Sequence, residues 1–149
     1  MEPTPPPIEI LSLDSVRNRL AALWLIGGAV ILILVVMQCL LGHFGDRAQE
    51  ALGWLLPTLM PTLSMIVTVL TYTALEPRVL DAIVRRSFFW VAYYLSVFYL
   101  LLILVTILVQ PFTPTEPLQL MRLSNLWLGP VQGLTASAIG VLFVSKKSK

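Results

Sequence analysis

Four long runs of the chain contain no Asp, Glu, Lys, Arg or His, and they limit what this sequence can fold into. They cover residues 20–41, 52–73, 88–109 and 126–144. Each is close to the ~20 residues that a helix needs to span ~30 Å of hydrocarbon. Only 12% of the 149 residues are charged, whereas soluble domains carry about 25%. The sequence therefore predicts an all-α integral membrane protein with four transmembrane helices and short loops.

The first run has one alternative interpretation, which is a cleaved signal peptide. Such a peptide has a basic start and an apolar core of only about 7–15 residues. Here the apolar run is longer, the acidic residues Glu2, Glu9 and Asp14 precede it, and no small-residue cleavage site closes it. We therefore expect this run to be retained as the first transmembrane helix.

Lysine and arginine are distributed unevenly between the two sides that four spans would define. One side would hold Arg17, Arg19, Arg78, Arg85, Arg86, Lys146, Lys147 and Lys149, and the other only Arg47 and Arg122. Lys and Arg accumulate in cytoplasmic loops. Both termini are therefore predicted to be cytoplasmic, in a multi-pass protein of the cell (inner or plasma) membrane. The net charge of +2 then reflects this topology, and no nucleic-acid partner is expected.

The segments outside the spans are short. Residues 1–19 form a proline-rich cytoplasmic tail with a helical lead into the first span, residues 20–144 form the four-helix domain, and residues 145–149 form a basic cytoplasmic end. After Pro77, mixed charges predict a short helical extension before the third span. Since a domain of fewer than about 40 residues rarely folds alone, no soluble catalytic or binding domain is predicted.

The second span carries an unusual number of prolines, threonines and serines. At 100° per residue, seven positions spaced four and three apart share one helix face. We call this set the polar seam: Glu50, Trp54, Pro57, Pro61, Ser64, Thr68 and Thr71. Thr58 and Thr62 lie on a different face.

Two interpretations of the polar seam remain open. Serine and threonine are common where membrane helices touch, and their hydroxyls bond to carbonyls one turn earlier while prolines bend the helix. Alternatively, several copies of this helix line a water-filled path. Hydroxyl rings would then wet the wall, and Glu50 at the outer mouth would form an acidic ring that attracts cations.

The fourth span combines small residues with one strongly polar side chain. Gly129, Gly133, Ser137 and Gly140 fall on one face, and such a face lets two helices approach closely, either within the chain or between copies. The amide of Gln132 needs partners that lipid does not supply. We expect it to form an interhelical hydrogen bond, with a pore or ligand contact as the alternative.

No motif in the sequence indicates catalysis. His43 is the only histidine, the spans hold no paired aspartates, and no metal-ligand spacing or phosphate-binding loop is present. We therefore expect no enzyme activity, catalytic residue, metal site or cofactor. One hypothesis is a homo-oligomeric passive ion channel or membrane-perturbing pore lined by the second span. The other is a non-catalytic membrane anchor or regulatory subunit that recruits a soluble cytoplasmic partner.

Overall fold

The computed structural model describes residues 10–75 and 83–144, and it is built from four long helices. These are α1 (Leu13–Leu40), α2 (Ala48–Leu75), α3 (Arg86–Leu108) and α4 (Pro117–Val144). Within the described residues, α1, α2 and α3 are long and apolar enough to cross a membrane. The predicted class, a helical bundle suited to a membrane, is confirmed at this level. The fourth crossing stays a prediction.

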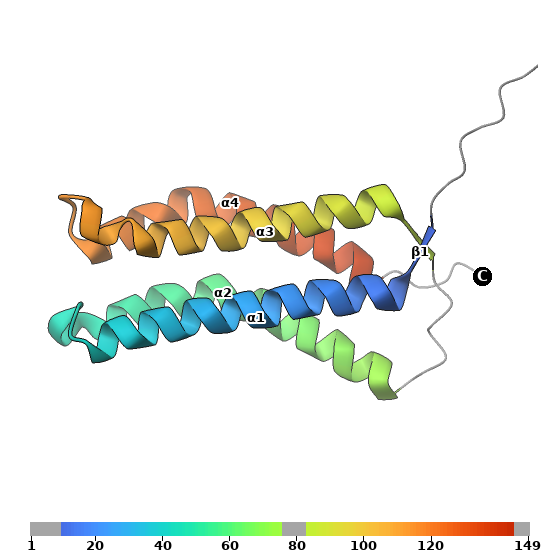
Figure 1. The fold of residues 1–149 in the computed structure, drawn as a ribbon, viewed down its shortest axis with the longest axis horizontal. Helices are drawn as coiled ribbons and strands as arrows, with labels where there is room; N and C mark the ends of the chain where they lie inside the picture. Colours follow the sequence, from blue (N-terminus) through green and yellow to red (C-terminus); the bar gives the residue numbers. More distant parts are fainter. Residues whose placement is uncertain (1–9, 76–82, 145–149) are drawn as a thin grey trace, which may run out of the picture.

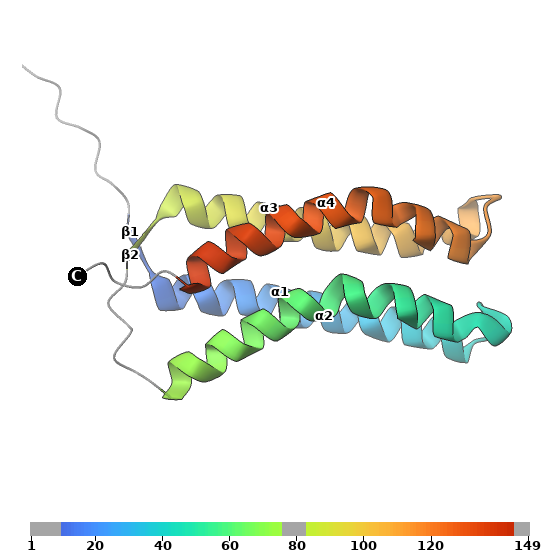
Figure 2. The ribbon, with the colours of Figure 1, turned by 180° about the vertical axis from the view of Figure 1, so that it is seen from behind.

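The helices form an up-and-down bundle in which each helix packs on two neighbours. Around the bundle the order is α1, α2, α4, α3. Figure 1 shows α1 and α3 in front, and Figure 2 shows α2 and α4 from behind. The connections 41–47 and 109–116, which include the 3-10 turns η1 (Gly45–Arg47) and η3 (Gln110–Phe112), lie at one end, which we call the loop end. The first residue of α1 and the last of α4 lie at the opposite end.

All four helices begin before the apolar runs, and α1 and α4 do so by the most residues. Helix α1 begins at Leu13, directly after Ser12, which occupies the N-cap position with an extended backbone but makes no side-chain capping bond. Helix α4 begins at Pro117, where proline is tolerated because the first turn of a helix has free amides anyway. The start of α1 lies within the segment that was expected to form a helical lead into the first span. For α4, the polar residues after Pro117 continue the helix, so the apolar run placed this boundary too late.

A short two-stranded ribbon joins the beginnings of α1 and α3. Strand β1 (Ile10–Ser12) pairs antiparallel with β2 (Ile83–Arg85), and Leu11 lies opposite Val84. The prediction of a helical extension is therefore wrong for residues 83–85. The β-branched Ile83 and Val84 favour an extended strand once a partner strand is available. The rest of that predicted extension, residues 76–82, lies outside the described residues.

Side chains from all four helices fill the interior of the bundle. The largest fully buried ones are Trp24, Tyr99, Leu20, Leu55, Leu59, Ile66, Ile103, Ile107, Met121, Leu128 and Ile139. Two glycines allow α1 to approach its neighbours. A Cβ added at Gly27 would lie 2.9 Å from Leu100 of α3, and one added at Gly28 would lie 3.2 Å from Leu63 of α2. A side chain at either position would therefore push α1 away from its neighbour.

Helix α2 bends near its middle, and its second half diverges from α1 (Figure 2). Pro57 and Pro61 lie inside the helix at this place. Proline lacks the backbone N–H that would bond to the carbonyl four residues earlier, and its ring pushes against that carbonyl. The bend exposes backbone acceptors in the interior, and other helices must supply donors to them.

Candidate functional site

Five of the seven polar-seam residues lie on the outer surface of the single-chain bundle. Pro57, Pro61, Ser64, Thr68 and Thr71 are all exposed. The hydroxyl of Thr68 donates to the Ser64 carbonyl at 2.8 Å, and that of Thr71 donates to the Val67 carbonyl at 2.9 Å. The side chains of this face therefore point mainly away from the bundle interior, and its two threonine hydroxyls are satisfied within α2. It is available to lipid, to water or to a second copy.

Trp54 departs from the exposed face. Its side chain is only 7% exposed, and its indole nitrogen donates to the Ser124 hydroxyl of α4 at 3.1 Å. On the helical wheel it lies at the edge of the seam, next to the buried Thr58. A large side chain at that edge reaches the neighbouring helix, so Trp54 joins α2 to α4 instead of facing outward.

Glu50 belongs to a network of four charged residues at the loop end. Its carboxylate accepts from Arg47 at 2.8 Å and from Arg122 of α4 at 2.6 Å. Arg47 also pairs with Glu116, which precedes α4. Two positive and two negative groups balance, so Glu50 does not present an unpaired negative charge. The network ties the two interhelical connections together across the loop end.

At the bend in α2, a side-chain amide of α4 donates hydrogen bonds to backbone carbonyls of α2. Because Pro61 has no N–H, the Pro57 carbonyl lacks its helical partner. The side-chain nitrogen of Gln132 lies 3.3 Å from that carbonyl oxygen and 3.2 Å from the Thr58 carbonyl oxygen. Gln132 thus donates to α2 beside the proline, from a half-buried position between the two helices.

Helix α3 supplies a second donor to the same place. The Tyr99 hydroxyl donates to the Thr58 carbonyl at 2.9 Å, and the Thr58 hydroxyl in turn donates to the Trp54 carbonyl at 2.6 Å. Neither Tyr99 nor Ser124 was predicted to make these contacts. A signal was available for Tyr99, because a tyrosine hydroxyl in the middle of an apolar run needs a partner when it is buried.

The small residues of α4 do not pack against another helix of the chain. A Cβ added at Gly129, Gly133 or Gly140 would meet nothing within 4 Å. Ser137 is exposed, and its hydroxyl donates to the Gly133 carbonyl at 2.8 Å. This open face belongs to the helix that neighbours α2 in the bundle (Figure 2).

The exposed polar seam of α2 offers groups that can be hydrated or can contact another helix. Apart from Glu50, the seam offers hydroxyls and carbonyls with no ionisable group, and no group of three or more metal-ligating side chains occurs within the described residues. Comparison of the chain with protein-family models, curated proteins and solved structures finds no match.

Proposed function

We propose that the protein crosses the cell membrane four times, with both termini in the cytoplasm. Helices α1, α2 and α3 are long and apolar enough to span. Helix α4 is as long as α1 and α2, at 28 residues, which corresponds to about 42 Å. It packs alongside α3. The end of the bundle where α1 and α3 begin carries Arg17, Arg19 and Arg86, whereas the loop end carries only Arg47 and Arg122 within the described residues. This charge bias fits a cytoplasmic location for the termini.

In this proposal several copies assemble so that their α2 helices line a passive ion path. The observation that supports it is the exposure of five seam residues on a bundle whose interior is filled with side chains. A face that was buried within the chain would not be free to meet an axis shared by several copies. The adjacent helix α4 carries the open small-residue face, on which a neighbouring copy could pack closely.

Water access to α2 tests this proposal. Cys39 is the only cysteine, so a Cys39→Ala background allows single cysteines to be placed at will. We expect Ser64→Cys to react with a charged, membrane-impermeant thiol reagent added to proteoliposomes, because a pore-lining position is hydrated. Labelling should also block ion flux.

The matched control for this labelling is Phe98→Cys. Phe98 of α3 is also exposed on the bundle. It lies 12 residues after the start of α3 at Arg86, and Ser64 lies 11 residues before the end of α2 at Leu75. A lipid-facing thiol stays protonated and unreactive, so labelling should be at least tenfold slower at this position. Equal, slow labelling at both positions in a folded oligomer would exclude a path along α2.

Ion selectivity gives a separate prediction at the loop end. Glu50→Gln leaves Arg47 and Arg122 opposed only by Glu116, so we expect the reversal potential under a salt gradient to shift toward anion preference. Asp46→Asn removes the same charge from an exposed residue of η1. It lies outside the network and should shift the potential less. An unchanged potential in Glu50→Gln would remove the loop end from the conducting path.

A non-conducting anchor or regulatory subunit is the second candidate. The charge balance around Glu50 favours it, because a neutral mouth does not concentrate cations. In that case the cytoplasmic segments would recruit a soluble partner. The copy number in mild detergent separates the two: a ring of four or more copies supports the pore, whereas a stoichiometric complex with another protein supports the anchor.

A further inference from the structure

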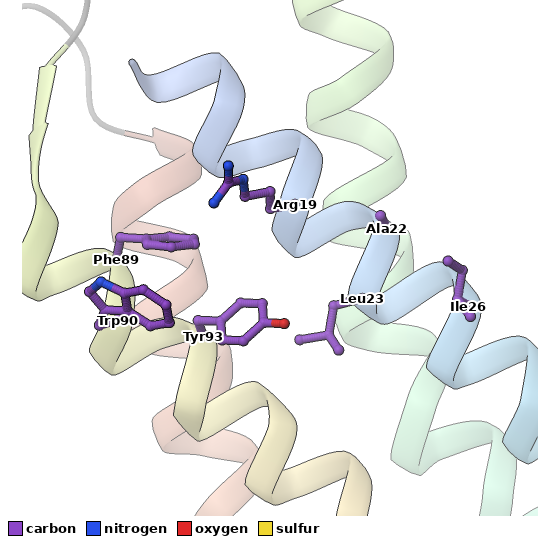
Figure 3. A pocket seen from close by; sticks show the side chains of 7 residues that line it. All are labelled: Arg19, Ala22, Leu23, Ile26, Phe89, Trp90 and Tyr93. Atoms are coloured by element: carbon purple, nitrogen blue, oxygen red, sulfur yellow. The ribbon is translucent and has the colours of Figure 1, made fainter. Parts of the chain in front are cut away.

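A pocket opens between α1 and α3 at the end of the bundle where both helices begin. It has a volume of about 340 Å³ and is lined by Arg19, Ala22, Leu23, Ile26, Phe89, Trp90 and Tyr93. Figure 3 shows Arg19 on α1 and the three aromatic side chains on α3, with Tyr93 directed toward Leu23. Arg19 is exposed and has no ion-pair partner among the residues that the structure describes. The pocket therefore combines one available positive charge with an aromatic wall.

A second pocket continues the first one along the same pair of helices. It has a volume of about 210 Å³, shares Leu23 with the first, and is lined only by apolar residues: Leu23, Gly27, Val30, Ile31, Val97, Leu100, Leu101 and Leu104. Gly27 contributes no side chain to the α1 wall of this groove. From Arg19 to Ile31 the helix rises about 18 Å, which is close to the ~15 Å thickness of one hydrocarbon leaflet.

We infer that this α1/α3 groove binds one anionic phospholipid, with its phosphate on Arg19 and one acyl chain along the apolar pocket. Three observations support this occupant over a helix of another copy: the arginine lies at one end only, the rest of the groove is apolar, and the length matches one leaflet. Trp90 stacks on Tyr94 with ring centroids 5.2 Å apart and lies 5.9 Å from the Tyr93 ring. Such amphipathic rings favour the headgroup level of a bilayer.

The inference rests on the proposed membrane crossing, but it does not depend on conduction or on copy number. The groove lies between α1 and α3, whereas α2 and α4 form the opposite side of the bundle (Figures 1 and 2). A lipid could therefore occupy the groove in either a pore or an anchor.

Native mass spectrometry of the detergent-solubilised protein tests the inference. Phosphatidylglycerol and phosphatidylcholine with identical chains are added in equal amounts, and the lipid-bound fractions are compared. We expect one phosphatidylglycerol to be retained in preference to phosphatidylcholine, and Arg19→Gln to reduce this preference about fivefold. Arg122→Gln removes one positive charge at the loop end, far from the groove, and should leave the preference unchanged.

A second pair of variants tests the acyl-chain pocket. Val30→Trp should fill the groove and reduce retention of both lipids. Ile33→Trp places the same side chain at an exposed position of α1 outside the groove and should not. Far-UV circular dichroism verifies that both variants fold. Equal retention of the two lipids by the wild type, or an unchanged preference in Arg19→Gln, would overturn the inference. So would a Val30→Trp variant that separates copies without loss of lipid, because the groove would then hold a second copy.

Discussion

Trp24→Ala is expected to reduce the free energy of unfolding by about 3–5 kcal/mol, because it removes the largest side chain in the interior of the bundle. Trp24 is fully buried, and its ring centroid lies 5.8 Å from that of Tyr99. Lipid tails are as apolar as the protein interior, so tight packing between membrane helices carries much of their stability. The void left by alanine would lie between α1 and α3, where no neighbouring side chain is free to fill it without leaving its own contacts.

The measurement is unfolding in mixed micelles of increasing SDS content, followed by far-UV circular dichroism. Trp127→Ala is the matched control, because Trp127 of α4 is 43% exposed. We expect it to cost on the order of 0.5 kcal/mol. Equal losses in both variants would show that Trp24 does not hold the two helices together.

Gln132→Leu is expected to cost about 0.6–1.7 kcal/mol in the wild-type chain, and much less when Pro61 is also replaced by alanine. This cost is the one measured for interhelical hydrogen bonds in membrane proteins. With Pro61→Ala, a backbone N–H becomes available to the Pro57 carbonyl, so that the amide of Gln132 is no longer its main donor. The two substitutions should therefore be coupled.

A double-mutant cycle by the same unfolding assay measures this coupling. Thr135→Val provides the control on α4, because the Thr135 hydroxyl donates to the Val131 carbonyl of its own helix at 2.7 Å. Its coupling to Pro61→Ala should be close to zero. A Gln132→Leu cost that stays the same with and without Pro61 would mean that Gln132 does not compensate for the proline.

The central parts of the helices were predictable because a helix in lipid must satisfy its backbone internally and needs a minimum apolar length. The ends were less predictable. Residues 117–125 include Arg122 and Asn125, which lowered the apparent extent of the fourth helix, yet Pro117 begins a helix that runs without interruption to Val144. The pairing of β1 with β2 joins segments more than seventy residues apart, and no local pattern specifies such a partner.

The sequence predicted which residues share the polar seam, but not whether that helix face points into the bundle or away from it. Helical periodicity places Pro57, Pro61, Ser64 and their companions on one face because each residue turns the helix by about 100°. It does not state whether that face meets a neighbour. The same limit applied to α4, where the small residues suggested close packing and the structure leaves them open within the single chain.

Sequence alone determined the helical class, the approximate positions of the four helices and the residues that share the polar seam, because composition and periodicity are local properties of the chain. Tertiary structure decided that the seam faces outward, that Trp54 leaves it for Ser124, and that Gln132 and Tyr99 meet the carbonyls beside Pro61. These outcomes depend on how four helices rotate and bend to fill one interior. That rotation is set by contacts between residues far apart in sequence, such as the Tyr99 hydroxyl on the Thr58 carbonyl.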